Sequence, residues 1–229
     1  CNSIRVVTKG RIYVLQTKDS LIKTIKTMDP QKIVFWLGAG VDYNYPTGLP
    51  LAKSLMESLL QYSCGSYYED LKQHIERNFQ NGIPRMETII SEIKLFEGEL
   101  KRPTNILQGF SAFLDAPPNY CHFVLAEYLR SGANIVSMNY GNQIQKAYNS
   151  LYSTPSSVMP EFSEKFNMYI WSSKQSEGNI YYPHGDAYHL DNIGISLNEI
   201  KNSLSDGFCN KIAEWIYEGY CFIFAGYSC

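Results

Sequence analysis

The chain has 229 residues, of which 45% are apolar and 18% are charged, and its formal net charge is −2. These values fit an ordinary globular protein with one sizeable core. The slight negative charge gives no support to a nucleic-acid surface, and no apolar run approaches the roughly 20 residues that cross a bilayer. We therefore predict neither direct nucleic-acid binding nor a membrane partner.

The six cysteines are scattered along the chain and never occur in C-x-x-C spacing. Paired C-x-x-C motifs are the usual source of ligands for a structural zinc ion, so we expect no zinc or other metal site. Together with the absence of a signal peptide, this scatter predicts reduced thiols in a cytoplasmic protein.

Residues 1–30 are predicted to form an N-terminal extension. Residues 4–15 contain two short extended runs around Lys-Gly and predict a hairpin, and residues 19–28 have the apolar spacing of a helix. The chain begins with Cys1 rather than Met and stops at Cys229 directly after a strand-like run. We expect it to be a fragment of a longer protein that forms one domain over residues 1–229.

An apolar run rich in β-formers, IVFWLG, covers residues 33–38 and has the pattern of a buried parallel strand. From Leu51 to about Arg130 the periodicity is helical, with a break at Pro117-Pro118 and a final helix that Gly132 closes. A block of roughly 80 residues is too long for one crossover helix. Residues 51–130 are therefore predicted to be a helical insert.

Strand signals return four times after residue 131, with helical stretches between some of them. The strand-like runs are ANIVSMN, NMYIWSS, NIYYPHG and YCFIFAGYS. This alternation predicts an α/β fold: a Rossmann-like, doubly wound, mostly parallel sheet built from residues 31–50 and 131–229, with the inserted helical subdomain. Ligands of such sheets bind beyond the carboxyl ends of the strands, so residues 38–41, 139–142, 184–186 and 226–228 matter most.

Three features at these strand ends could carry chemistry. Gly38-Ala39-Gly40 would let backbone N–H groups approach a phosphate, but a purely structural turn explains it equally well. It is not the dehydrogenase fingerprint G-x-G-x-x-G/A, because that pattern requires a small residue at position 43, which is Tyr here. Asn139 offers a donor and an acceptor on one amide, or simply forms a turn. His184 is a candidate general base, or else a surface or packing residue.

Taken as a set, the motifs at the predicted strand ends and one loop motif resemble the sirtuin-like superfamily. In chain order they are Gly38-Ala39-Gly40, Gly48-Leu49-Pro50, Ser137-Met138-Asn139-Tyr140-Gly141, His184-Gly185 and Gly226-Tyr227-Ser228. The resemblance extends over most of the chain, from about Ile33 to Ser228.

Protein deacylases of this superfamily carry paired C-x-x-C zinc ligands and an Asp-Phe-Arg after Gly-Ile-Pro. This chain has neither, since Leu-Ala-Lys follows Pro50. It is more similar to the bacterial sirtuin-like NADase domains of anti-phage defence systems. That resemblance implies an NAD+ hydrolase that depletes NAD in abortive infection, working as a homo-oligomer or with a fused or associated defence partner.

The resemblance also implies roles for individual residues around NAD, which would be the substrate. Asn139 would hold the ribose or the attacking water, and His184 would accept a proton from water or a ribose hydroxyl. Gly226 and Ser228 would line the adenosine side, and residues 43–45 would form a lid. The turn that carries the pyrophosphate would be Gly38, Ala39, Gly40 and Val41, and the other residues placed around NAD are Asp42, Gly48, Pro50, Ser137, Gly141 and Gly185.

Two positions depart from the family pattern. Gly141 stands where the family has an Asp that helps to hold the nicotinamide end, and Asp42 stands where it usually has Ser. They support an alternative: a catalytically impaired module that senses NAD or an ADP-ribose derivative. A third function, NAD-dependent protein deacylation, lacks the zinc ligands.

Other polar residues have plainer explanations. His122 lies within a helical stripe, and we expect it to pack or to cap a helix. Asp186 and His189 are near His184 in sequence and could tune it, but a surface loop is the simpler expectation.

Overall fold

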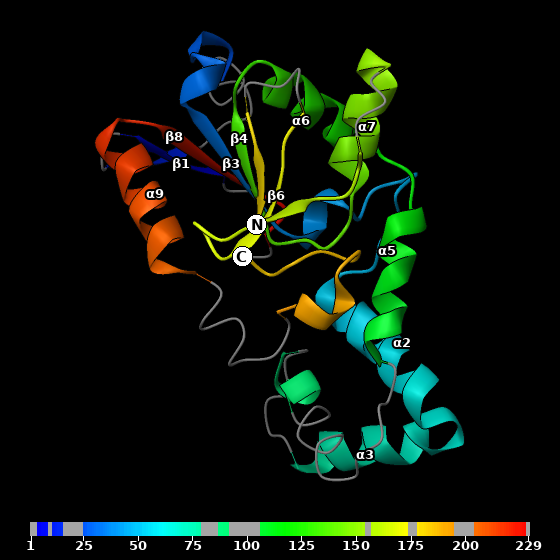
Figure 1. Ribbon diagram of the computed structural model, residues 1–229. Coiled ribbons are helices and arrows are strands. Elements are labelled where there is room, and N and C mark those ends of the chain that lie inside the picture. Colours follow the sequence, from blue (N-terminus) through cyan, green and yellow to red (C-terminus); the bar gives the residue numbers. More distant parts are fainter. Residues whose placement is uncertain are drawn as a thin grey trace.

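A computed structural model describes residues 4–8, 11–15, 25–78, 87–91, 106–153, 157–173, 178–194 and 204–227 (Figure 1). Of the predicted site residues, Ser228 lies outside these ranges, as does the start of the helix predicted over residues 19–28. No helix of the described ranges is both long enough and apolar enough to cross a membrane.

The described strands form one mixed sheet of eight strands in the order β2-β1-β8-β3-β4-β7-β6-β5. The centre, β8-β3-β4-β7, is parallel, while the hairpin β1–β2 and the pair β6–β5 add antiparallel strands at the two edges. The predicted α/β class and the hairpin at residues 4–15 are therefore confirmed. The strand bounds are β1 Ile4–Thr8, β2 Arg11–Leu15, β3 Ile33–Leu37, β4 Asn134–Ser137, β5 Glu161–Ser163, β6 Met168–Trp171, β7 Ile180–Tyr182 and β8 Cys221–Ala225.

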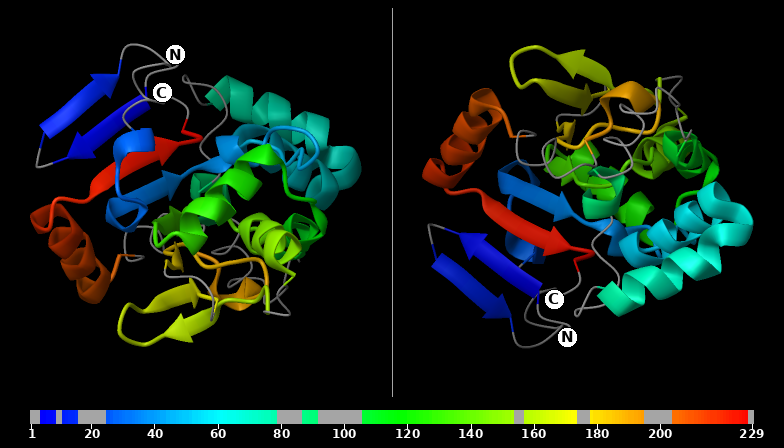
Figure 2. Two further views of the ribbon diagram at one scale, coloured as in Figure 1. Left: turned by 90° about the horizontal axis from the view of Figure 1, so that it is seen from above. Right: turned by 90° about the horizontal axis from the view of Figure 1, so that it is seen from below.

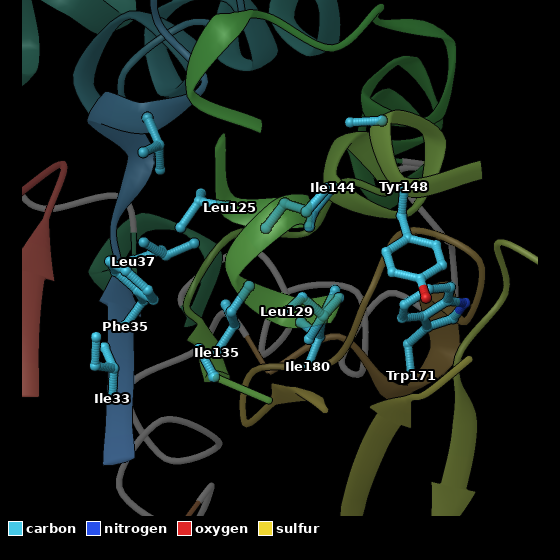
Figure 3. Packing of buried hydrophobic residues seen from close by; sticks show 14 of the residues in the cluster. Ile33, Phe35, Leu37, Leu125, Leu129, Ile135, Ile144, Tyr148, Trp171 and Ile180 are labelled. Atoms are coloured by element: carbon cyan, nitrogen blue, oxygen red, sulfur yellow. The ribbon is translucent and has the colours of Figure 1, made fainter. Parts of the chain in front are cut away.

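Alternation along β3 explains why its sequence is a continuous apolar run. Ile33, Phe35 and Leu37 pack with α6 (Tyr120–Arg130) and α7 (Gln143–Tyr152) on one face of the sheet (Figure 3). Val34 packs on the opposite face with α9 (Asp206–Tyr217). Successive side chains of a strand point to opposite faces, so a strand covered on both sides must be apolar at every position. Figure 2 shows these helices on the two sides of the sheet.

Helix α6 begins and ends at residues that the sequence makes recognisable. Asn119 and His122 form a capping box at its start. At its end Gly132, with φ +100°, donates to the Leu129 carbonyl, and the Ala133 N–H donates to the Tyr128 carbonyl. This is a Schellman motif, which confirms that Gly132 closes the helix.

The remaining helices form a second hydrophobic cluster at one end of the molecule (Figure 1). Leu59 of α2, Phe110 and Phe113 pack there with Tyr140, which follows β4, and Ile193, which follows β7. The predicted insert, residues 51–130, thus contains helices of this cluster together with α6, which packs on the sheet. The bounds are α2 Ala52–Cys64, η3 Gly65–Tyr67, α3 Tyr68–Asn78, η4 Ile106–Ser111 and α5 Ala112–Asp115; the other short turns are η1 Pro30–Lys32, η2 Ala39–Val41 and η5 Leu190–Asn192.

Candidate functional site

Parallel register brings the ends of three strands to one edge of the sheet. Leu37, the last residue of β3, pairs with Ser137 of β4 and with Ala225 of β8. The turns that follow these strands therefore lie side by side. The sequence predicted this edge as the ligand-binding edge.

The glycine turn after β3 packs directly against the turn after β8. Gly40 N–H donates to the Gly226 carbonyl at 2.8 Å, and a Cβ on Gly38 or Gly40 would lie within 2.9 Å of Gly226 backbone atoms. Gly226 itself has φ +78°. These three glycines thus allow two backbones to approach closely, a reason for glycine that requires no ligand.

Most amides of this turn already have backbone acceptors. The N–H groups of Gly38, Gly40, Val41 and Asp42 donate to carbonyl oxygens of the same turn or of the β8 end. Among the described residues, the Ala39 N–H is then the amide of this turn that has no backbone acceptor and could donate to a ligand. The pyrophosphate site at this turn stays a prediction. Fewer of its N–H groups are free to bind a phosphate than the Gly-Ala-Gly sequence led us to expect.

Asn139 reaches from the end of β4 to the end of β3. Its Nδ2 donates to the Gly38 carbonyl at 3.0 Å, and its backbone N–H donates to Ser137 Oγ at 3.2 Å. The side-chain amide of Asn139 is therefore held beside the glycine turn. The predicted proximity of Asn139 to this turn is confirmed.

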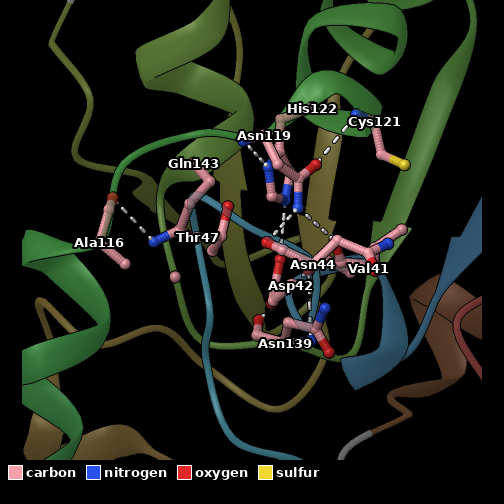
Figure 4. A network of polar contacts seen from close by, with 12 residues as sticks. Val41, Asp42, Asn44, Thr47, Ala116, Asn119, Cys121, His122, Asn139 and Gln143 are labelled. Atoms are coloured by element: carbon pink, nitrogen blue, oxygen red, sulfur yellow. Dashed lines mark hydrogen bonds and ion pairs between the residues drawn. The ribbon is translucent and has the colours of Figure 1, made fainter.

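Asp42 and His122 form a buried pair that the sequence did not reveal. His122 Nε2 lies 2.8 Å from Asp42 Oδ1, and the two residues are only 1% and 5% exposed (Figure 4). His122 Nδ1 accepts the Asn119 N–H at 3.0 Å, so the proton of a neutral ring sits on Nε2 and is donated to Asp42. The expectation that His122 caps a helix is confirmed, and its second role is to hold Asp42.

The loop that contains Asp42 is tied to the start of α6. Asn119 Nδ2 donates to the Val41 carbonyl at 2.9 Å, and Thr47 Oγ1 donates to the Pro117 carbonyl at 2.7 Å. Tyr43 and Tyr45, the predicted lid, are 58% and 92% exposed.

A small polar cavity lies between these groups. It holds about 10 Å³ of free space, close to what one water molecule needs. Its lining residues are Leu37, Val41, Asp42, His122, Ser137, Asn139, Gly141, Gln143 and Ile144.

Gln143 fills the space beside Gly141. A Cβ on Gly141 would collide with the Gln143 Oε1, while Gln143 Nε2 donates to the Phe113 carbonyl at 2.5 Å and the Ala116 carbonyl at 3.4 Å. The amide of Gln143 thus occupies the space that a side chain at position 141 would need. Sequence reasoning missed this residue, because only the three-dimensional turn brings it back over Gly141.

His184 does not line the cavity that Asn139 lines. It is half-buried in the turn after β7, and burial lowers its pKa from the ordinary 6.5, an effect that Glu87 of the helical region opposes. Gly185, with φ +78°, lets this turn pass the Asn192 carbonyl. The structure therefore joins Asn139 with Asp42 and Gln143, and not with His184, in one cavity.

Asp186 corrects one expectation. It was predicted to lie in a surface loop, but it is 2% exposed, and His189 Nδ1 lies 2.9 Å from its Oδ2. Burial raises the pKa of Asp186, although hydrogen bonds from His189 and the Tyr188 N–H oppose the shift. The His189 ring stacks on Tyr169 with ring centroids 4.0 Å apart.

The other predicted site residues lie in the loop after the glycine turn. Gly48, with φ +60°, donates its N–H to the Asn44 carbonyl, and Pro50 precedes α2. Neither residue lines the cavity. Within the described ranges, no group of three His, Cys, Asp or Glu side chains could hold a metal ion.

Comparison with known proteins adds nothing to this geometry: no protein-family model matches the chain, and no curated protein matches it.

Proposed function

We propose that this chain hydrolyses NAD+ to nicotinamide and ADP-ribose. The observation that carries the proposal is the polar cavity at the carboxyl ends of β3 and β4, where Asp42, Asn139 and Gln143 converge beside the glycine turn. Helices on both faces of a parallel centre support the finer expectation of a Rossmann-like, doubly wound core with a helical insert.

The chemistry of the nicotinamide–ribose bond suits such a site. Nicotinamide leaves as a neutral molecule, so positive charge develops on the ribose and no strong acid is required. The protein must hold a water molecule against the anomeric carbon and stabilise that charge. A water-sized polar cavity with a fixed amide, Asn139, can do the first, and the Asp42 carboxyl group that lines the cavity can do the second.

The biological role that goes with this activity is NAD depletion in defence against phage, as the resemblance to sirtuin-like NADase domains implies. In that setting the chain would act as a homo-oligomer or together with a defence partner.

The direct test is to incubate the purified protein with NAD+ and to measure the released nicotinamide by reversed-phase chromatography. Asn139→Ala should lower the rate by about 10²-fold, because loss of a positioning group misplaces the attacking water. Asn210→Ala, an exposed asparagine of α9, is the matched control and should leave the rate unchanged. Equal release by all three proteins would contradict the catalytic assignment.

One alternative has its own support in the structure. Position 141 has no carboxylate and the Gln143 amide fills the space beside it, which favours a module that binds NAD or ADP-ribose without cleaving it. Calorimetry that shows binding of both nucleotides, with no nicotinamide released, would establish this function instead.

A further inference from the structure

We propose that Asp42 is the general base of this site, held in place by His122, and that His184 is not. This inference rests on the proposed hydrolysis of NAD+. In this reaction Asp42 accepts the proton that the attacking water loses.

Elimination among the cavity residues points to Asp42. Among the lining side chains, Asp42 and His122 are the two whose chemistry allows them to accept a proton from water, because the amides of Asn139 and Gln143 do not do so. His122 cannot serve, because its Nδ1 takes the Asn119 N–H and its Nε2 proton goes to Asp42. Asp42 therefore keeps the basic lone pairs that face the cavity.

The position of Asp42 is rigid, as a general base requires. Its backbone N–H donates to the Ala39 carbonyl at 3.1 Å, and its carbonyl accepts the Leu49 N–H at 3.0 Å. His122 fixes the carboxylate itself, and the capping box at Asn119 fixes the His122 ring. Such supporting contacts hold a catalytic group in one orientation.

The Asp42 side chain also bears on how the substrate is oriented. Its carboxyl group lines the cavity, while His122 contacts its Oδ1. A carboxylate repels a pyrophosphate and attracts a cationic ribose. The nicotinamide–ribose end of NAD+ therefore belongs at Asp42, and the pyrophosphate belongs further from it.

The step balances without another reactant. The water oxygen bonds to the anomeric carbon of the ribose as the bond from that carbon to the pyridinium nitrogen breaks. The bonding electrons go to the nitrogen and neutralise the ring. The proton of the water passes to the Asp42 carboxylate and then to solvent.

The experiment compares Asp42→Asn with Asp70→Asn, an exposed aspartate of α3, in nicotinamide release and in calorimetric binding of ADP-ribose. Asp42→Asn keeps the shape and an oxygen that can accept the His122 N–H. We expect its kcat to fall by about 10²–10⁴-fold, as for loss of a general base, with ADP-ribose affinity within about threefold of wild type. Asp70→Asn should match wild type in both measurements.

Chemical rescue separates a missing base from a damaged fold. Asp42→Ala opens space in which formate can replace the carboxylate, so added formate should restore release several-fold in this variant but not in Asn139→Ala. Wild-type kcat in Asp42→Asn, or no effect of formate, would overturn the assignment of the base while leaving the proposed hydrolysis standing. No release by wild type, with ADP-ribose still bound, would overturn the hydrolysis and this inference together.

Discussion

His122 and Asp42 are separated by 80 residues, yet His122 Nε2 lies 2.8 Å from Asp42 Oδ1 with both side chains buried. The contact joins the first helix turn of α6 to the loop after β3. It is one of the ties between the two segments, together with those from Asn119 to Val41 and from Thr47 to Pro117, and it leaves a buried polar group unpaired when either partner is lost.

Replacing His122 should destabilise the fold strongly. In His122→Ala, Asp42 loses its partner and the Asn119 N–H loses its acceptor, so we expect the free energy of unfolding to fall by about 1–3 kcal/mol for each group left unpaired. Urea denaturation followed by circular dichroism measures this. Lys53→Ala, at an exposed position of α2, should change it by less than about 0.5 kcal/mol.

A double-mutant cycle tests whether the interaction between His122 and Asp42 accounts for this loss of stability. The cost of His122→Ala should be smaller in an Asp42→Ala background, by about 0.5–3 kcal/mol, if the two side chains interact as the geometry indicates. Additive costs would contradict this.

Gly226→Ala should cost far more stability than Gly219→Ala. Both glycines have nearly the same positive φ, +78° and +77°, so both substitutions carry the same backbone strain, about 1–2 kcal/mol. A Cβ at Gly226 also collides with the Gly38 carbonyl, whereas a Cβ at Gly219 has no atom within 4 Å. The added collision should cost about another 1–3 kcal/mol in thermal or urea unfolding. Equal effects would show that the close approach of the two turns is not required.

Gly141→Asp should not simply add a carboxylate to the cavity. The new side chain displaces the Gln143 amide from the Phe113 and Ala116 carbonyls, at a cost of about 1–3 kcal/mol for buried groups left unpaired. Urea unfolding checks the cost, and nicotinamide release checks the function. The double variant Gly141→Asp, Gln143→Ala makes room for the carboxylate, so its release should exceed that of the single variant.

His184 should make the fold less stable in mild acid. Burial lowers its folded pKa below 6.5, so as the pH falls past 6.5 the unfolded chain takes up a proton that the folded chain resists. Stability is therefore complete above pH 6.5 and decreases as the pH falls toward the lower folded pKa. Unfolding free energies at pH 7.5 and 5.5 should differ less in His184→Gln than in wild type. Asn210→Ala, at an exposed position without a titratable group, should keep the wild-type difference.

Several elements were predictable because their signals are local. The apolar run at residues 33–38 indicated a strand buried on both faces, and Gly132 indicated a helix end; both follow from side chains within a few positions of each other. The shared strand-end edge of Gly38 and Asn139 followed from the rule that parallel strands point the same way.

The site was less predictable because its contacts are long-range. Nothing in the sequence near Asp42 indicates His122, and the burial of Asp186 depends on elements packed around the turn after β7. Strand direction was also hidden: β6 is as apolar as β7, yet the two run antiparallel. Composition and periodicity carry no information on direction.

The Gln143 side chain forms part of the cavity wall, and its amide also donates to the Phe113 carbonyl of α5. One turn further along α7, Lys146 donates to the Leu114 and Ala116 carbonyls of the same helix end. A ligand that rotates the Gln143 amide would therefore remove its hydrogen bonds to the Phe113 and Ala116 carbonyls and weaken the contact between α7 and α5. The same side chain thus belongs both to the cavity wall and to the contact between α7 and α5, so its replacement would alter the two together.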